Sequence, residues 1–334
     1  MSLRRISFSP GEWTGALGDL GISVPVLLAL SASGSLDLSR ALLLFGAVYI
    51  GAGLYFRLPI PVQPLKAATA LVIARGLGGA ALRACALWMA AILAVFSLTG
   101  FSDRINRLFT RTVVRGIQLG VGLLLLKAAY KLLLSSPHAG AAAPVAAAFP
   151  SLPELASAFW VLVLPQLPLT LGNSVAATCD VSAGYFGEEA ARVRPRSVTM
   201  SIALSNLAAG LLGGMPVCHG SGGVTAHHKF GARTAGSTII LGAAFISLAL
   251  LLGSAGAAAA LAAIPRWLLA ALLAWTGLLH ARLMLDKKAV LPVALAMGAL
   301  GLATSNLSYA LALGLAAEGA LRWTPLSRLQ GARS

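Results

Sequence analysis

Long apolar runs dominate the chain, and short polar stretches separate them at intervals that suit a lipid bilayer. Runs of about 17–25 apolar residues match helices that cross a hydrocarbon core about 30 Å thick. The pattern predicts an all-α polytopic membrane protein with about twelve transmembrane segments, several of them short or broken. The predicted spans lie near 13–34, 38–56, 59–77, 80–100, 112–134, 155–178, 197–213, 216–233, 235–255, 264–280, 290–304 and 306–322.

The chain also repeats itself. Gly18-Asp19 in the first predicted span corresponds to Gly172-Asn173 in the sixth, an offset of 154. Pro61-Val62 corresponds to Pro216-Val217 at the start of the eighth, an offset of 155. Because five crossings precede the second copy, the two copies enter the membrane in opposite directions, as in many secondary transporters. We expect a first inverted repeat at 1–134, an external linker at 135–154, a second repeat at 155–289, and two further spans with a short cytoplasmic tail at 290–334.

Two spans are broken in equivalent places. Between Leu58 and Ala70, three prolines in six residues deny helix hydrogen bonds, which leaves a helix of about 16 Å, half a membrane, from Leu65 to Arg75. The glycine-rich segment from Gly213 to Thr225 is its counterpart. The breaks predict two discontinuous half-helix spans whose positively polarised N-termini meet at a central anion site. The alternative is a proline-kinked span without a ligand.

Polar residues inside spans are costly and mark candidate site residues. The candidates for substrate binding are Gln63, Lys66, Gln166, Asn173, His219, Ser221 and Gly222. Asp19 is either a proton-coupling carboxylate or a structural charge that holds the first span to the third. Lys66 has neutralisation of Asp19 as its alternative role, and Gln166 and Asn173 have interhelical hydrogen bonding.

Composition excludes an ordinary soluble domain, because 58% of residues are hydrophobic and only 10% are charged. The formal net charge is nevertheless +15. In a soluble protein this excess would suggest nucleic acid, whereas here it reports topology, so no nucleic-acid partner is expected. We read the basic N-terminus as part of a retained first helix and not as a cleaved signal.

Basic residues fall mainly on one side when the N-terminus is placed in the cytoplasm. The cytoplasmic side receives 18: Arg4, Arg5, Arg57, Arg104, Arg107, Arg111, Arg115, Arg192, Arg194, Arg196, Lys229, Arg233, Arg282, Lys287, Lys288, Arg322, Arg328 and Arg333. The outside receives 5: Arg40, Arg75, Arg83, Lys131 and Arg266. This ratio predicts an inner-membrane protein with both termini cytoplasmic. The basic helical face that contains Arg104, Arg107, Arg111 and Arg115 predicts an interfacial anchor to anionic lipid.

Neither a metal site nor a cofactor is expected. His227 and His228 are adjacent, so on a helix they point about 100° apart, and no HExxH or CxxC spacing is present. The three cysteines give no disulfide framework. An enzyme is therefore not expected; the alternative is a membrane-embedded enzyme that uses Asp19, His219 and the histidine pair.

Four segments resemble the signature segments of molybdate transporters related to the sulfate permeases. They are Gly15–Gly21, Pro61–Ala67, Pro165–Asn173 and Gly214–Gly223, within a resemblance that spans about 11–255. The resemblance implies an inverted-repeat transporter of the uracil-permease and sulfate-permease architecture, with a core domain that holds the half-helices and a gate domain that moves against it. Relatives of this architecture are often dimers, so a homodimer is an expectation of the resemblance.

The expected function is secondary active import of molybdate by alternating access, with tungstate or sulfate as further candidate substrates. Asp19 or His219 would carry a coupling proton. Larger relatives have fourteen spans, whereas we count twelve here. They also have a cytoplasmic C-terminal regulatory domain, which we do not expect here, since only about a dozen residues follow the last predicted span. The alternatives are a transporter of another small anion or a nucleobase, and a passive channel.

Overall fold

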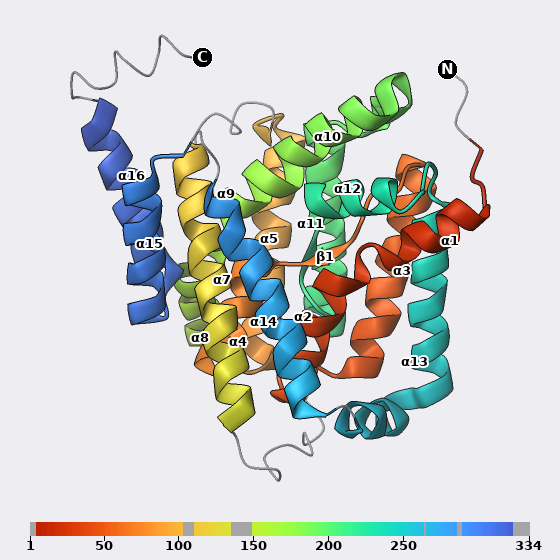
Figure 1. Ribbon diagram of the computed structural model, residues 1–334, viewed down its shortest axis with the longest axis horizontal. Coiled ribbons are helices and arrows are strands. Elements are labelled where there is room, and N and C mark those ends of the chain that lie inside the picture. The colour runs from red at the N-terminus through yellow and green to blue at the C-terminus, as the bar shows by residue number, and fades with distance from the viewer. Residues whose placement is uncertain (1–4, 103–109, 135–148, 264, 286–288, 323–334) are drawn as a thin grey trace.

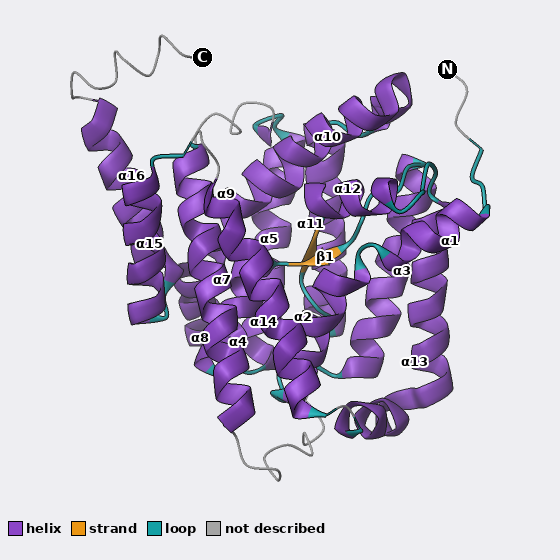
Figure 2. Cartoon of the chain, in the orientation of Figure 1, coloured by secondary structure: helices purple, strands orange, loops and turns teal. Residues whose placement is uncertain are grey.

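A computed structural model describes residues 5–102, 110–134, 149–263, 265–285 and 289–322. It is mostly helical, at 81% (Figures 1 and 2). The α-helices are α1 Pro10–Leu17, α2 Leu20–Ala32, α3 Leu38–Phe56, α4 Lys66–Arg75, α5 Gly79–Leu98, α7 Arg111–Leu134, α8 Leu152–Ala158, α9 Leu164–Leu169, α10 Ala177–Phe186, α11 Pro195–Leu212, α12 Ser221–Lys229, α13 Gly236–Ala262, α14 Arg266–Arg282, α15 Leu291–Thr304 and α16 Leu307–Arg322. Two strands, β1 Gln63–Pro64 and β2 Val217–Cys218, lie among them, with π-helical η1 Phe159–Val163 and η2 Thr170–Ala176 and 3₁₀-helical η3 Gly187–Arg192 and η4 Leu283–Leu285.

Helical segments occupy each of the twelve ranges that the apolar pattern indicated. Length and composition qualify six described helices to cross a membrane: Leu38–Phe56, Gly79–Leu98, Arg111–Leu134, Leu152–Arg192, Gly236–Gly253 and Arg266–Leu285. Shorter apolar helices cover Ser23–Ala32, Leu291–Thr304 and Leu307–Ala320. The described chain is therefore an integral membrane protein with several apolar spans.

The helices pack in pairs. Helix α3 lies along α13, α5 along α11, and α7 along both α14 and α15 (Figure 1). Glycines bring two of these pairs close. A Cβ on Gly46 would lie 2.5 Å from the Gly242 carbonyl oxygen, and one on Gly122 would lie 2.6 Å from the Gly277 oxygen. Small residues at helix crossings let backbones approach closely, which is how helices gain contact inside a membrane.

Two further segments are interrupted by residues that weaken helix hydrogen bonding. The first predicted span breaks between α1 and α2, where Gly18 and Asp19 stand. The sixth contains two π-helical stretches, and Pro165 and Pro168 lie between them in α9. Such irregularities often mark functional positions in membrane helices.

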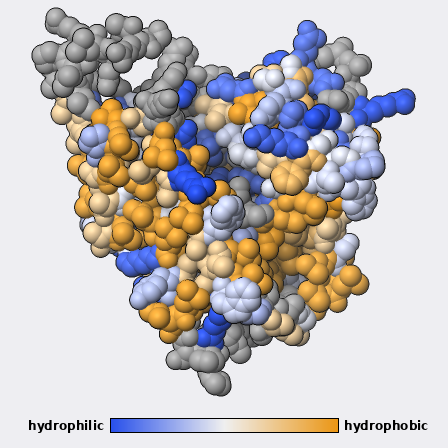
Figure 3. Space-filling view, in the orientation of Figure 1, coloured by the Kyte–Doolittle hydropathy of each residue, from blue (hydrophilic) through white to orange (hydrophobic). Residues whose placement is uncertain are grey.

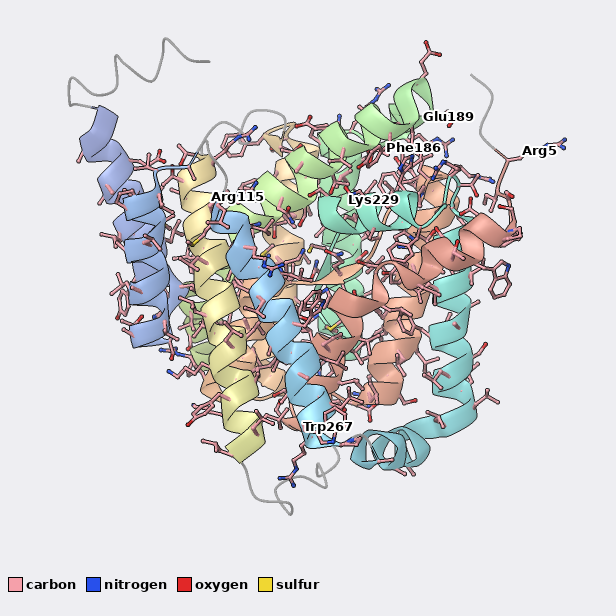
Figure 4. All side chains as sticks on the ribbon, in the orientation of Figure 1. Arg5, Arg115, Phe186, Glu189, Lys229 and Trp267 are labelled. Carbon is pink, nitrogen blue, oxygen red and sulfur yellow. The ribbon has the colours of Figure 1, made fainter. Side chains whose placement is uncertain are left out.

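The surface is apolar around the middle of the molecule. Figure 3 shows orange side chains over most of one face and blue ones gathered toward the upper right, with a hollow between the two sides of this face. In Figure 4, Arg5, Glu189 and Lys229 lie toward that upper edge, and Trp267 lies at the opposite edge. Large exposed apolar side chains such as Leu98 and Leu251 are expected where lipid replaces water.

Several basic residues have contacts or burial that the charge pattern alone did not indicate. Arg83 is buried, and its guanidinium donates to the carbonyl oxygens of Gly210 and Leu211, at 3.0 and 2.8 Å, so it caps the end of α11. In the predicted basic face, Arg111 is exposed while Arg115 donates to Gln118 at 2.8 Å. The positions that lie outside the described residues are Arg4, Arg104, Arg107, Lys287, Lys288, Arg328 and Arg333, together with most of the predicted linker (135–148) and the predicted tail (323–334).

Candidate functional site

The site is built on two short strands that cross at the centre of the molecule (Figure 2). Strands β1 and β2 pair antiparallel, with Gln63 opposite Cys218 and Pro64 opposite Val217. The Leu65 N–H continues the pairing by donating to the Pro216 carbonyl oxygen at 3.0 Å. Prolines hold this backbone extended, and pairing satisfies polar groups that lipid could not. Each strand runs directly into a short helix, so α4 and α12 begin close together.

A chain of hydrogen bonds begins at the first residue of α4. The Lys66 ammonium donates to Gln63 Oε1 at 2.8 Å, and Gln63 Nε2 donates to Asp19 Oδ1. The Tyr49 hydroxyl donates to Asp19 Oδ2 at 2.5 Å. Asp19 is fully buried, so these neutral donors replace the water that its oxygens would bind. Gln63 therefore links the lysine to the carboxylate, and Asp19 ties the first span to the second and third.

Gln166 caps the N-terminus of α4 from the sixth predicted span. Its Oε1 accepts hydrogen bonds from the N–H groups of Ala67, at 2.9 Å, and Ala68, at 3.2 Å. Its Nε2 donates to Thr170 Oγ1 at 3.0 Å. The first N–H groups of a helix have no partner within it, so an oxygen from another element satisfies them. Gln166 thus makes the interhelical contact that was its alternative role.

The start of α12 has a similar polar contact. The Ser221 hydroxyl donates to Asn173 Oδ1 at 3.1 Å, and Asn173 belongs to the π-helical η2. A Cβ on Gly223 would lie 2.7 Å from Gln63 Nε2, and one on Gly220 would lie 3.2 Å from Lys66 Nζ. These glycines let the start of α12 approach the polar side chains of β1 and of α4. A Cβ on Gly222 would meet open space, so its backbone faces an unobstructed side of the helix start.

His219 is engaged by protein groups at both ring nitrogens. Nε2 lies 2.9 Å from Ser201 Oγ, and Nδ1 lies 2.7 Å from the Pro61 carbonyl oxygen. The ring packs edge-on against Phe56, with centroids 5.7 Å apart. Since a carbonyl oxygen only accepts, Nδ1 is the nitrogen that donates. In this structure His219 joins β2 to α11 and to the segment before β1.

A small cavity adjoins the Lys66 side chain. Its volume is about 10 Å³, and it is lined by Val26, Pro64, Lys66, Thr69, Leu125, Thr276 and His280. This volume is near the lower limit for one water molecule. A tetrahedral oxyanion is larger than one water molecule, so the cavity as it stands is closed to such an anion.

Three polar residues of the site escaped the sequence analysis. Asn206 of α11 pairs with β2: its Nδ2 donates to the Val217 carbonyl oxygen at 2.6 Å, and its Oδ1 accepts from the Val217 N–H at 3.1 Å. Tyr49 binds Asp19, and His280 lines the cavity. All three lie in predicted apolar spans, and their cost in such surroundings is the signal that could have found them.

The two adjacent histidines of α12 face different partners. His227 Nδ1 lies 3.1 Å from Ser237 Oγ, and the His228 ring stacks on Tyr185 with centroids 4.1 Å apart. Over the described part of the chain, no three His, Cys, Asp or Glu side chains gather where they would hold a metal ion.

The resulting fold is an apolar helical body in which two short helices begin at a paired strand crossing. Two solved structures share this fold: the transmembrane domain of a cyanobacterium bicarbonate transporter, BicA (TM-score 0.54, 18% identity, 90% of this chain and 96% of that one), and the murine anion transporter SLC26A9 in an inward-facing state (TM-score 0.62, 14% identity, 94% and 68%). The chain belongs to the molybdate transporter family, since the family model described as "Molybdate transporter of MFS superfamily" matches residues 11–125 and 158–279.

Named relatives agree with this assignment. Molybdate transporter 1 of Arabidopsis thaliana is 26% identical over 333 residues, which cover 72% of this chain and 73% of the relative. Molybdate transporter 1 of Chlamydomonas reinhardtii is 46% identical over 119 residues, which cover 34% of this chain and 23% of that one. The family and its structural neighbours are transporters and not enzymes.

Proposed function

We propose that the chain is a secondary active importer of molybdate that works by alternating access in the inner membrane. Its family and the names of its relatives support the substrate class. The observation that carries the site is the position of Lys66, whose ammonium lies at the start of one half-helix and close to Gly220 before the other. The partly buried Lys66 ammonium between two helix N-termini suits a dianion, whose lost hydration must be replaced by charge-assisted hydrogen bonds.

An inverted repeat underlies this proposal, and two contacts support it. Gln63 pairs with Cys218 across the strands, and 218 − 63 = 155. Gly122 meets Gly277 where α7 crosses α14, and 277 − 122 = 155. Residues related by one sequence offset thus face each other at two separate places, as a two-fold axis between repeats requires. The antiparallel strands fit copies that run in opposite directions.

Helix pairing follows the same rule. Adding 155 to the residue numbers of α3 gives a range that overlaps α11, and adding 155 to those of α5 gives a range that overlaps α13. The repeat therefore relates the α3–α13 pair to the α11–α5 pair, and the helices of both pairs are in contact. The same offset also carries the α1–α12 contact onto the α9–α4 contact. We therefore assign 1–134 and 155–289 to two repeats and infer twelve crossings, six of which are short or broken.

The charge distribution supports the orientation. Arg5 and Lys229, predicted to be cytoplasmic, lie toward one edge in Figure 4, whereas Trp267, next to the predicted external Arg266, lies at the opposite edge. The described end of α16 lies on the same side as the start of α1 (Figure 1). This arrangement fits cytoplasmic N- and C-termini and the excess of positive charge on the inner side.

Opening is part of the proposed cycle, because the cavity beside Lys66 is too small for the anion. The cavity lies between elements of two groups: α2, β1 and α4 on one side, and α7 and α14 on the other. Movement of α7 and α14 against the crossed strands would admit molybdate. Lys66, Gln63, Ser221 and Asn173 would then bind its oxygens, while Asp19, Gln166 and His219 hold the surrounding backbone.

The test is uptake of labelled molybdate into proteoliposomes that contain the purified protein. Saturable uptake is expected for the wild type, and it should fall by at least tenfold in Lys66→Ala and Gln63→Ala, since each loses a charged or bridging hydrogen bond worth roughly 1.5–3 kcal/mol. Arg5→Ala, at an exposed position away from the site, is the control and should keep wild-type uptake. Absence of saturable uptake would refute the function, and unchanged uptake in both site variants would refute the site.

A second candidate is transport of another small anion by the same site. The fold shared with a bicarbonate transporter favours it over a nucleobase. Competition between labelled molybdate and unlabelled tungstate, sulfate, bicarbonate or uracil ranks these ligands in one assay. Stronger competition by sulfate or bicarbonate than by unlabelled molybdate would support the second candidate.

A further inference from the structure

His280 is a buried histidine on α14 that faces the cavity beside Lys66. Its Nδ1 lies 2.8 Å from the carbonyl oxygen of Thr276, one turn earlier in the same helix. Because a carbonyl oxygen only accepts hydrogen bonds, Nδ1 carries the hydrogen, and Nε2 of the neutral ring presents a lone pair. A lone pair repels an oxyanion, whereas a protonated Nε2–H would donate to one.

Packing does not require a histidine at this position. The offset of 155 that relates the two repeats carries Leu125 onto His280, and both side chains line the same cavity. Leucine therefore fills the equivalent place in the first repeat. A polar ring in such surroundings costs free energy unless it has a further role.

The charges around the ring favour protonation only when an anion is present. Helices α2 and α7, which pack against α14, present the apolar Val26 and Leu125 to the cavity, and α4 presents the Lys66 ammonium as a further part of the cavity lining. Lys127 of α7 donates instead to Ser305 at 2.9 Å. A second positive charge next to Lys66 would be repelled, and a dianion between the two would reverse that repulsion.

We propose that His280 is a substrate-binding residue of α14 that takes up one proton together with each oxyanion. The inference rests on the proposed function, which supplies the dianion. A proton from the aqueous phase binds the Nε2 lone pair, and the new N–H donates to an oxyanion oxygen opposite Lys66. The two cations then match the two negative charges of the ligand. Release of the anion restores the repulsion by Lys66, and the proton leaves with it.

The position of His280 on α14 gives it a role in closure of the cavity around the anion. Gly277, one turn before His280, meets Gly122 of α7, so the two helices move as a closely packed pair. An anion held by Lys66 on α4 and by His280 on α14 would draw the two sides of the cavity together. The proton on His280 therefore helps to hold the anion in the closed state, in addition to its part in driving transport.

Proton uptake on ligand binding tests the proposal. Molybdate is added to detergent-purified protein in weakly buffered solution, and the pH change is recorded together with the molybdate dissociation constant between pH 5.5 and 8. The wild type should take up close to one proton per bound anion near the upper end of this range. Its affinity for molybdate should rise by about tenfold for each unit by which the pH is lowered, over the pH range where one full proton is taken up per anion.

His280→Gln and His280→Leu should abolish the uptake and flatten the pH dependence, and the leucine copies the residue of the other repeat. At low pH both should bind molybdate at least tenfold more weakly, the loss expected for one charge-assisted hydrogen bond of roughly 1.5–3 kcal/mol. His228→Gln, at the histidine stacked on Tyr185, is the matched control and should behave as wild type.

The outcomes separate this inference from the proposed function. A wild type that binds no molybdate, tungstate or sulfate refutes both. A wild type that binds molybdate without taking up a proton refutes the role of His280 and leaves the function standing, whether or not the variants fold. Uptake that persists in either folded His280 variant also refutes it.

Discussion

The side chain of Gln166 caps α4, a helix that begins 100 residues earlier at Lys66, through its hydrogen bond from the Ala67 N–H at 2.9 Å. The oxygen occupies the position where helix N–H groups would otherwise meet an anion. Gln166→Leu should lower the free energy of unfolding by about 1–3 kcal/mol, because the N–H groups of Ala67 and Ala68 lose their partner in a buried place. Thermal unfolding in detergent measures this, and no change in the unfolding temperature would contradict the capping role.

Replacing the same side chain by a carboxylate separates folding from binding. Gln166→Glu keeps an oxygen at the N-terminus of α4, where negative charge is favourable, so the protein should fold. The fixed charge beside Lys66 should nevertheless weaken molybdate binding by at least about tenfold, since like charges near 4 Å repel by roughly 4 kcal/mol at an effective dielectric constant of 20. Equilibrium binding of labelled molybdate checks the prediction, and wild-type affinity would exclude Gln166 from the neighbourhood of the anion.

The carboxylate of Asp19 depends on two donors at once. Tyr49→Phe removes the hydroxyl that donates to Oδ2 and should destabilise the fold by about 1–3 kcal/mol, because the carboxylate is fully buried. In the double variant Tyr49→Phe/Asp19→Asn, the loss should be smaller than the sum of the two single losses, since both remove one interaction. Unfolding midpoints of the four proteins complete the cycle. Strict additivity would show that the two residues do not act together.

Apolar run lengths and proline–glycine breaks were sufficient to place the helices and both short helices of the site. These signals are local: the bilayer sets the run length, and prolines before Lys66 and glycines before Ser221 end regular helix nearby. The hydrogen-bond partners of the site residues could not be predicted from the sequence in the same way. Tyr49 reaches Asp19 across 30 positions and Gln166 reaches Ala67 across 99, so each contact depends on how helices cross. His280 belongs to no motif: its polar ring in an apolar span is the one local signal, and the cavity that it lines depends on how the helices pack.

Close backbone contact between α7 and α14 should make one glycine intolerant of a methyl group. A Cβ on Gly122 would lie 2.6 Å from the Gly277 oxygen, and relief requires the two helices to separate. Gly122→Ala should cost about 1–3 kcal/mol, as overpacking does elsewhere. In Gly51→Ala the methyl group meets open space within α3, and that variant should be neutral or stabilised by up to about 1 kcal/mol. Equal unfolding temperatures for the two variants would contradict the crossing.

The carboxylate of Glu12 accepts hydrogen bonds from backbone N–H groups of the segment that leads into α13. Its Oε1 accepts from the N–H groups of Arg233 and Thr234, at 3.0 and 2.8 Å, and its Oε2 accepts from the Ser237 N–H at 3.0 Å. Glu12→Gln replaces one acceptor oxygen by a donor, so it should destabilise the protein by about 1–3 kcal/mol. The control Glu188→Gln alters an exposed side chain and should change stability by less than about 0.5 kcal/mol. Similar losses in both variants would show that Glu12 has no special role.

A final prediction concerns the start of α12, where Asn173 Oδ1 accepts from the Ser221 hydroxyl at 3.1 Å. Asn173→Ala removes this contact and should weaken molybdate binding modestly, by about threefold to tenfold, the effect of one neutral hydrogen bond. Asn173→Asp keeps an acceptor for Ser221 but adds negative charge where the anion would bind. It should weaken binding by more than the alanine does, although it retains the native contact. That order distinguishes a site occupied by an anion from one occupied by a neutral ligand, for which the aspartate would be the milder change. Binding titrations with molybdate decide the order, and uracil run in parallel gives the neutral comparison.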